Sequence, residues 1–133
     1  MEDIFIGRLM STDVATVDPG TSVREAARRL HERRIGSLVV VGEGNQPEGI
    51  ITTTDFVRLV ADGASVEDAT VADYMSEELV TAEVGDDIES AADRLVTYDI
   101  HHLPVVDETE GVVGMLSTTD LASYLSGIEA EPL

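Results

Sequence analysis

The two halves of the chain repeat one another at a fixed offset, so the fold must accommodate two copies of one unit. Sliding the sequence by 65 residues aligns residues 6–60 with 71–125 without a gap, and roughly 17 of about 55 pairs are identical. The run GIITTTD at residues 49–55 returns as GMLSTTD at residues 114–120. Each run has the pattern of an apolar strand end, a hydroxyl-rich turn and the first turn of a helix. The duplication therefore predicts two related sites, each ending in a carboxylate.

Within each copy, the pattern of apolar residues predicts the element order β-α-β-β-α. Dense β-branched runs are typical of buried strands, and apolar residues at the 3.6-residue period are typical of helices. The expected helices cover 23–33, 53–61, 88–98 and 118–125, and the expected strands cover 14–17, 38–41, 49–51, 79–82, 103–106 and 112–116. Ser22 with Glu25 is expected to form a capping box, and Asp87 is expected to cap the equivalent helix.

One copy alone, at about 55–60 residues, has a small core and is expected to be only marginally stable. We therefore predict an α/β (α+β) fold in which two β-α-β-β-α repeats pack about a pseudo-twofold axis. The repeats are placed at residues 4–63 and 69–126, and residues 127–133 are expected to form a flexible tail. The natural clefts are then expected where the strand ends of the two copies meet.

Charge limits the kinds of partner that the chain can bind. The net charge is −19, because 27 acidic residues face eight arginines and no lysine. A nucleic acid or an anionic membrane is not expected as a partner, since phosphate binding needs a cationic face. With no apolar run long enough to span a bilayer, no secretory signal and no cysteine, the chain is expected to be cytoplasmic. The acidic surface favours a halophile, whose salt screens carboxylate repulsion, over an acidic mesophile protein.

The order of these motifs resembles a known family, the tandem pair of cystathionine β-synthase (CBS) domains, or Bateman module. The motifs that carry the resemblance are residues 49–55 and 114–120, the run IHHLPVVD at residues 100–107, and the Met-Ser pairs at residues 10–11 and 75–76. Each motif alone is weakly specific, but their order in duplicate is highly specific. The resemblance covers about residues 4–126.

The resemblance implies a regulatory module that binds AMP, ADP, ATP or S-adenosylmethionine in the cleft between the repeats, with no cofactor. No metal site is expected either, because the chain has no cysteine and places no third nitrogen or sulfur ligand near His101 and His102. It implies that the motif aspartates accept hydrogen bonds from ribose, that nearby hydroxyls and histidines contact ribose or phosphate, and that groups near the first two strands hold adenine. The implied ligand-binding residues are Thr16, Ile35, Thr52, Thr54, Asp55, Thr81, Ile100, His101, His102, Ser117, Thr119 and Asp120.

Each of these assignments has a structural alternative. Asp55 and Asp120 stand three residues after a hydroxyl residue, which is also the signature of a helix start. The hydroxyl residues at the two helix starts are equally compatible with simple capping and turn chemistry, namely Thr52, Thr54, Ser117 and Thr119. His101 and His102 have only Gly36 and Ser37 as counterparts in the first copy. If phosphate contacts cross between repeats, the cleft of Asp55 receives the histidines, and we predict unequal sites with that cleft the better nucleotide site.

Two functions remain open from the sequence. The first is a sensor that binds an adenosine compound and signals to a separate effector protein. The second is a ligand-free dimerisation or scaffold module. The resemblance implies a homodimer formed through the helices at 53–61 and 118–125. An enzyme is not expected, because no nucleophile with an adjacent base, Walker loop or metal triad is present. The sequence leaves open the ligand, the number of occupied clefts, the effector and the dimer orientation.

Overall fold

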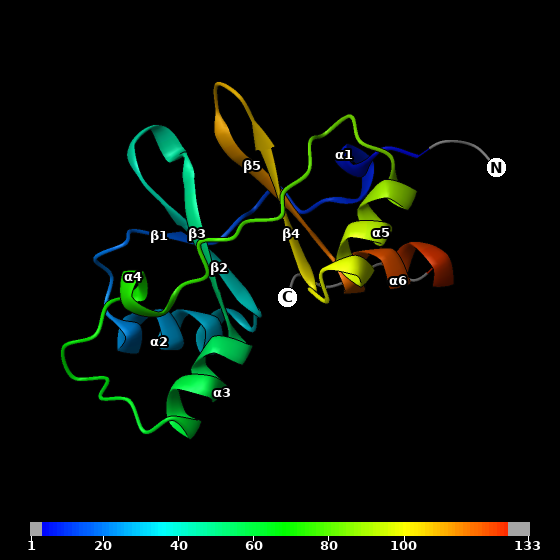
Figure 1. The fold of residues 1–133 in the computed structure, drawn as a ribbon. Helices are drawn as coiled ribbons and strands as arrows, with labels where there is room; N and C mark the ends of the chain where they lie inside the picture. The colour runs from blue at the N-terminus through cyan, green and yellow to red at the C-terminus, as the bar shows by residue number, and fades with distance from the viewer. Residues whose placement is uncertain (1–3, 128–133) are drawn as a thin grey trace. The chain divides into compact units, whose positions relative to one another are not determined.

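The computed structural model describes residues 4–127, which fold into two compact units. The first unit comprises residues 15–79, and the second comprises residues 4–14 together with 80–127 (Figure 1). The elements are α1 (Ile6–Leu9), β1 (Thr16–Val17), α2 (Val23–Arg33), β2 (Ser37–Val41), the 3₁₀ turn η1 (Glu43–Asn45), β3 (Pro47–Thr52), α3 (Thr53–Ala61), α4 (Val71–Tyr74), α5 (Ile88–Thr97), β4 (His102–Asp107), β5 (Gly111–Ser117) and α6 (Thr118–Ser126).

The first unit is built on a three-stranded sheet. Its strand order is β1-β2-β3, with β1 parallel to β2 and β2 antiparallel to β3. The core between the sheet and the helices is aliphatic, and Leu38, Val40 and Ile51 are completely buried in it. The central strand β2 is buried along most of its length, as its β-branched sequence predicts.

The second unit has a two-stranded antiparallel sheet, β4-β5, over a core that includes Leu103, Val105 and Leu116. The strand predicted over residues 79–82 shrinks to a single parallel bridge between Ala82 and Val105. Proline explains the difference. In the first unit the Val39 N–H donates to the Ala15 carbonyl at 3.1 Å, but the residue equivalent to Val39 is Pro104, which has no N–H to donate.

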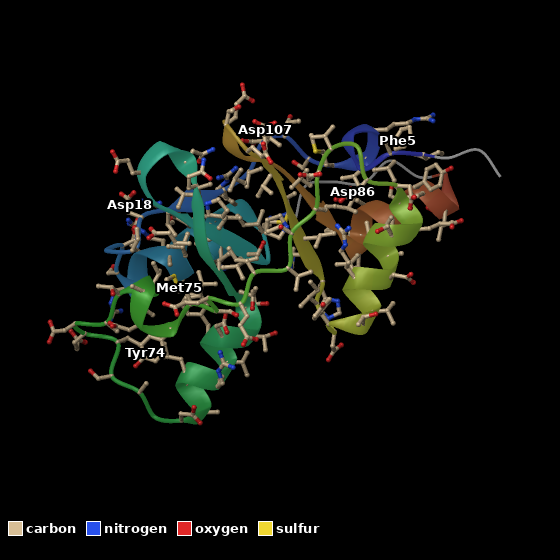
Figure 2. The ribbon with its side chains drawn as sticks, turned by 45° about the horizontal axis from the view of Figure 1, so that its top comes forward. Phe5, Asp18, Tyr74, Met75, Asp86 and Asp107 are labelled. Atoms are coloured by element: carbon tan, nitrogen blue, oxygen red, sulfur yellow. The ribbon has the colours of Figure 1, made fainter. Side chains whose placement is uncertain are left out.

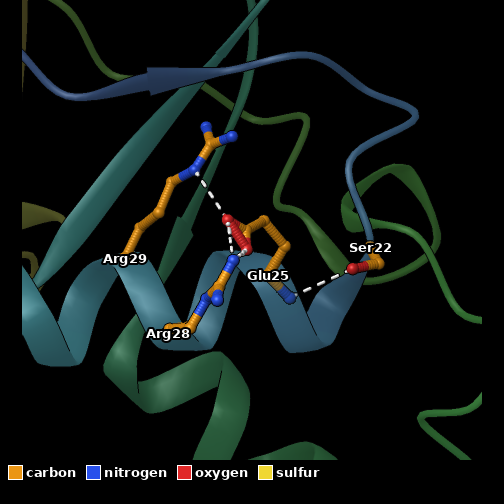
Figure 3. A network of polar contacts seen from close by, with 4 residues as sticks. All are labelled: Ser22, Glu25, Arg28 and Arg29. Carbon is orange, nitrogen blue, oxygen red and sulfur yellow. Dashed lines mark hydrogen bonds and ion pairs between the residues drawn. The ribbon is translucent and has the colours of Figure 1, made fainter.

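The predicted helix caps form, with one difference. The Ser22 hydroxyl accepts from the Glu25 N–H at 3.0 Å, and the Asp87 carboxylate accepts from the Ser90 N–H at 2.8 Å. The reciprocal half of the box at α2 is missing. The Glu25 carboxylate instead binds the guanidinium groups of Arg28 and Arg29, which follow it by three and four residues (Figure 3).

The two compact units group the chain differently from the repeat. Helix α1 of the first copy belongs to the second unit, and α4 of the second copy belongs to the first unit. The hydrogen bonds show the exchange: the Gly7 N–H donates to the Val84 carbonyl at 3.1 Å, and the Ala72 N–H donates to the Pro19 carbonyl at 3.1 Å. These two bonds are related by the same 65-residue offset. Each unit therefore contains the strands of one copy and the short first helix, α1 or α4, of the other copy.

The exchange also explains the glycines of the repeated motif. A Cβ at Gly49 would lie 2.6 Å from the Met75 sulfur, and a Cβ at Gly114 would lie 2.5 Å from the Met10 sulfur. Each methionine therefore packs directly on the backbone of a strand. The Met-Ser pairs and the motif glycines are thus two halves of one packing contact.

The mixed α/β architecture predicted from the sequence is confirmed. Helix α2 has the predicted bounds, and α5 ends one residue early because Tyr98 is its C-cap. The packing of the repeats about a pseudo-twofold axis involves both units and stays a prediction. Apart from Gly127, the predicted tail lies outside the described residues. Within residues 4–127, every helix is too short or too polar to cross a membrane.

Candidate functional site

The first candidate corner is the run of residues 49–55, where β3 turns into α3. Thr52 is the N-cap, and the Asp55 carboxylate closes the turn by accepting from the Thr52 N–H at 2.8 Å and from its hydroxyl at 3.3 Å. The second carboxylate oxygen of Asp55 accepts from Arg58 at 2.5 Å. Asp55 is 8% exposed, whereas the Arg58 side chain is 63% exposed. Thr52 thus binds one carboxylate oxygen of Asp55, and the exposed Arg58 binds the other.

The second corner, residues 114–120, repeats this geometry where β5 turns into α6. The Asp120 carboxylate accepts from the Ser117 N–H at 2.8 Å, and the Ser117 hydroxyl accepts from the Asp120 N–H at 3.1 Å. Asp120 is half-buried, unlike the buried Asp55. The position equivalent to Arg58 is Ser123, so the second corner lacks that guanidinium. The two corners share a turn but differ in charge.

The same capping chemistry occurs at a third helix. At α4 the Asp73 carboxylate accepts from the Thr70 N–H at 2.9 Å and from the Thr70 hydroxyl at 3.3 Å. Thr70 follows no strand, and it lies outside the repeated motif. A capping box is therefore a structural device of this chain, and it does not by itself mark a binding site.

The two histidines lie in the second corner. The His101 carbonyl accepts from the Thr118 N–H at 3.0 Å, and His102 pairs with Ser117 across β4 and β5. Burial lowers the pKa of His102, the neighbouring His101 lowers it further, and the Asp120 carboxylate opposes both effects. A weakly basic imidazole thus lies beside the hydroxyl and carboxylate of this corner.

In the first unit the corresponding positions are uncharged. The Gly36 carbonyl accepts from the Thr53 N–H at 3.1 Å, and the buried Ser37 pairs with Thr52. This difference was predicted from the sequence. The further prediction, that His101 and His102 serve the cleft of Asp55, involves both units and stays a prediction.

Each unit holds two of the four residues expected near adenine. One lies on or beside the first predicted strand of its copy, and the other lies just before the second. Thr16 is half-buried on β1, and Thr81 is half-buried with its carbonyl accepting from Arg94 at 3.1 Å. Ile35 and Ile100 each pack against the core of their unit, directly before β2 and β4. Among the hydroxyls of the turns, Thr54 is exposed and Thr119 is half-buried.

The structure therefore groups the predicted residues by unit. The first unit holds Thr16, Ile35, Thr52, Thr54 and Asp55. The second unit holds Thr81, Ile100, His101, His102, Ser117, Thr119 and Asp120. Each group contains two residues expected near adenine and one hydroxyl–carboxylate corner.

Sequence reasoning missed Arg58. Its spacing of three residues after Asp55 is the helical distance for an ion pair, and this signal was available. Arg58 is the one feature that gives the first corner a positive charge of its own.

A hollow of about 390 Å³ lies elsewhere in the second unit, at the end of β4 far from His102. It is lined by residues 83–85 and 106–109, including Asp107, which Figure 2 labels together with nearby Asp86. The Asp107 carboxylate accepts from the Glu110 N–H and from the hydroxyl and N–H of Thr109, and these bonds lower its pKa. None of the predicted ligand-binding residues lines this hollow.

Comparison with known proteins places the chain among CBS domain proteins. The family model for the CBS domain matches twice, at residues 6–62 and 71–127. Over 122 residues the chain is 31% identical to an uncharacterised protein of Methanopyrus kandleri, covering 91% of this chain and 62% of that protein. It spans only about a quarter of the length of several homoserine O-acetyltransferases that it also matches.

Two solved structures resemble the fold closely. The CBS domain pair of protein MJ0100, in complex with 5′-methylthioadenosine and S-adenosyl-L-methionine, has a TM-score of 0.87 and 26% identity, and covers 95% of this chain and 98% of that chain. A CBS domain protein of Pyrobaculum aerophilum, complexed with AMP, has a TM-score of 0.83 and 24% identity, and covers 92% of this chain and 97% of that chain. The chain belongs to the CBS domain family and carries two CBS domains in tandem.

Proposed function

We propose that the chain is a regulatory module that binds an adenosine compound, such as AMP, ADP, ATP or S-adenosylmethionine, between its two repeats. The observation that carries the proposal is the duplicated hydroxyl–carboxylate corner, at residues 49–55 and 114–120, in a chain of this family. The likeness to a CBS pair that holds S-adenosyl-L-methionine and 5′-methylthioadenosine supports the choice of ligand class.

The chemistry of each corner fits a nucleoside. A carboxylate can accept hydrogen bonds from both ribose hydroxyls, and Asp55 and Asp120 are each fixed by their capping bonds. The hydroxyls at the start of α3 and α6 offer donors to a phosphate, and the positive end of each helix dipole favours its charge. In the first corner, a ribose hydroxyl that donates to the Asp55 carboxylate would share the Oδ1 atom of Asp55 with Arg58. Arg58 could then turn toward a phosphate, because most of its side chain is exposed.

We propose that the two sites are unequal. The first corner has Arg58, and the second has His101 and His102. If phosphate contacts cross between the repeats, the cleft of Asp55 receives both histidines and prefers nucleotides. The cleft of Asp120 then faces uncharged Gly36 and Ser37, which suits an uncharged or cationic adenosine compound.

A thermal melt with a ligand panel tests the proposal. The protein would be melted in molar potassium chloride with AMP, ADP, ATP, S-adenosylmethionine or adenosine in excess, with guanosine 5′-monophosphate as the control. At a hundredfold excess over Kd, one site adds about 2.7 kcal/mol to the free energy of unfolding. A rise in Tm with an adenosine compound alone supports the proposal, whereas no rise with any ligand, in protein free of bound nucleotide, contradicts it.

The chain offers a matched control for the role of the motif aspartates. Asp55→Asn and Asp120→Asn remove a charge from a corner and also weaken a capping box. Asp73→Asn weakens the equivalent box at α4, outside the motif. All three variants should lose a similar part of their unliganded stability, about 1 kcal/mol. Ligand binding should weaken only in the Asp55 and Asp120 variants, and an equal loss in the Asp73 variant would refute a ribose contact.

The binding signal needs a route to an output. We propose that ligand binding changes the arrangement of the repeats and that a separate effector protein reads this change, which requires different affinities for the ligand in the two arrangements. We also propose a homodimer. The exposed Val57 and Val60 on α3 and Leu125 on α6 support it, with exposed fractions of 69%, 74% and 83%.

A second candidate function is a ligand-free dimerisation module. The capping boxes favour it, because they explain both motif aspartates without any ligand. In that case the ligand panel produces no change in Tm, while the dimer persists.

We propose a regulatory rather than a catalytic role, although some longer relatives are enzymes. The sequence contains no nucleophile with an adjacent base, which supports this role. A cytoplasmic location and a halophilic host remain our proposals. The absence of cysteine and lysine and the 27 acidic residues support them.

A further inference from the structure

The second turn of α3 carries an arginine that reaches back to the start of the helix. Arg58 follows Thr54 by four residues and Asp55 by three, so the three side chains lie on one face of α3. Long side chains of a helix lean toward its N-terminus, which brings the Arg58 guanidinium over the first turn. There it donates to the Oδ1 atom of Asp55 at 2.5 Å. The carboxylate expected to bind ribose thus already has a cation as its partner.

The hydrogen bonds of Asp55 limit how many further donors its carboxylate can accept. A carboxylate offers about four acceptor positions, two on each oxygen. The Thr52 N–H and hydroxyl occupy the Oδ2 atom, at 2.8 and 3.3 Å, and Arg58 occupies one position of the Oδ1 atom. A single ribose hydroxyl can therefore donate to the Oδ1 atom beside Arg58, whereas two hydroxyls require Arg58 to move.

The second corner has a serine in place of this arginine. The residue equivalent to Arg58 is Ser123, and the Asp120 carboxylate accepts from the Ser117 N–H through its Oδ2 atom. Asp120 is half-buried, whereas Asp55 is buried, which is consistent with the Arg58 side chain covering part of it. The two corners therefore differ in what a ligand has to displace.

The ion pair of the first corner resists displacement but is able to open. A buried carboxylate that loses its cation is destabilised, so a ligand that removes Arg58 from Asp55 works against a real cost. The Arg58 side chain is 63% exposed, so its guanidinium can swing on its long stem without disturbing the core. A phosphate compensates for the lost partner, because a guanidinium binds phosphate oxygens in a bidentate manner.

We propose that Arg58 makes the first corner selective for phosphorylated adenosine compounds. In the empty corner Arg58 binds Asp55; when AMP binds, the ribose hydroxyls replace it on the Oδ1 atom and the guanidinium moves to the phosphate. Adenosine has no phosphate, so it breaks the ion pair without compensation and binds more weakly. The inference rests on the proposed function, but it uses residues of the first unit alone and does not require the histidines of the second.

Isothermal titration of the full chain with AMP and with adenosine tests this role. The background is Asp120→Asn, which weakens the ribose contact of the second corner, so that the first corner dominates binding. In this background, Arg58→Met should weaken AMP binding about tenfold, because a charge-assisted hydrogen bond is lost. The same change should strengthen adenosine binding a few-fold, because the Asp55 carboxylate is no longer occupied by an ion pair.

Opposite shifts for the two ligands distinguish this role from a structural one, since an arginine that only stabilised the corner would be needed equally by both. An unchanged ratio of AMP to adenosine affinity in Arg58→Met overturns the inference and leaves the proposed function standing. Loss of all binding in the Asp120→Asn background, in a chain whose wild type binds AMP, does the same. If the wild type binds no adenosine compound, the proposed function fails and the inference fails with it.

Helix α2 offers a matched control for the arginine. Arg28 pairs with Glu25 at the same spacing of three residues (Figure 3), and its side chain is 64% exposed. Arg28→Met should therefore leave the affinities for both ligands unchanged. Arg58→Gln, which keeps a polar side chain of good helix propensity, should shift the affinity ratio in the same direction as Arg58→Met. Urea midpoints of both Arg58 variants show whether either one is unfolded, so a folding defect in one does not decide the outcome.

A second ligand tests the displacement itself. 2′-Deoxyadenosine keeps one of the two neighbouring ribose hydroxyls, and one hydroxyl fits on the Oδ1 atom of Asp55 beside Arg58. Its affinity should therefore rise much less than that of adenosine when Arg58 is replaced by methionine. An equal rise for the two nucleosides would contradict a competition between Arg58 and the ribose hydroxyls.

Discussion

Gly49→Ala and Gly114→Ala test whether the methionines of the Met-Ser pairs pack on the motif strands. A Cβ at Gly49 would lie 2.6 Å from the Met75 sulfur and 2.8 Å from the Ser76 carbonyl oxygen. The sulfur can move, but the Ser76 oxygen accepts from the Ile50 N–H at 3.0 Å and cannot retreat without losing that bond. Overpacking of this kind costs about 1–3 kcal/mol, and the weakened hydrogen bond adds about 1 kcal/mol.

Gly114 differs in a way that separates the two causes. Its Cβ would lie 2.5 Å from the Met10 sulfur but 3.1 Å from the Ser11 carbonyl oxygen, so the clash is mainly with a flexible side chain. Gly114→Ala should therefore cost less than Gly49→Ala, about 1–2 kcal/mol. In a Met10→Ala background the cost of Gly114→Ala should nearly vanish, because no sulfur remains to clash with the new Cβ.

Urea unfolding measures these costs. Gly20→Ala and Gly85→Ala are the matched controls, one in each unit, because a Cβ at either position meets nothing within 4 Å. Both controls should be neutral or slightly stabilising, since alanine restricts the unfolded chain. If the motif variants unfold at the same urea concentration as the controls, or if Met10→Ala gives no relief to Gly114→Ala, the packing account is refuted.

Three further predictions concern the second unit. Replacing His101 and His102 together by alanine should weaken AMP binding far more than adenosine binding in calorimetry; an equal loss would remove the phosphate role. Because the pKa of His102 is lowered below 6.5, the unfolded chain takes up the proton first. The free energy of unfolding should therefore fall as pH drops through about 6.5, and the fall should be smaller in His102→Gln, as urea midpoints at several pH values would show. Arg94→Met removes hydrogen bonds to the Asp86 carboxylate, at 2.9 Å, and to the Thr81 carbonyl. It should cost about 1 kcal/mol and raise the pKa of Asp86 only partly in an NMR titration, because the Glu83 N–H is the larger cause of the lowered value.

The repeat made most of the fold predictable. The offset of 65 residues is reproduced in the hydrogen bonds, in the two corners and in the bulged strand pairs. Helix bounds followed from apolar periodicity and caps, since Ser22 and Asp87 were both identified in advance. These features depend on residues close in sequence, which is why pattern reasoning finds them.

The exchange of the short helices α1 and α4 between the units was not predictable, because it depends on which distant segment each helix packs against. Nothing in the pattern of residues 4–14 indicates that the Gly7 N–H will bond to Val84 rather than to Pro19. The shortened strand at residues 79–82 was predictable in principle, since Pro104 lacks the N–H that its partner strand needs. At the candidate site, the capping alternative was anticipated, but the ion pair of Asp55 with Arg58 was not.

Ligand binding itself is tested most directly by isothermal titration of the purified protein with S-adenosylmethionine and with AMP in molar potassium chloride. We predict saturable binding of at least one of them, no binding of guanosine 5′-monophosphate, and a marked loss of affinity in Asp55→Asn or Asp120→Asn but not in Asp73→Asn. Saturable binding that survives all three variants, or no binding of either adenosine compound to nucleotide-free protein, would contradict the account.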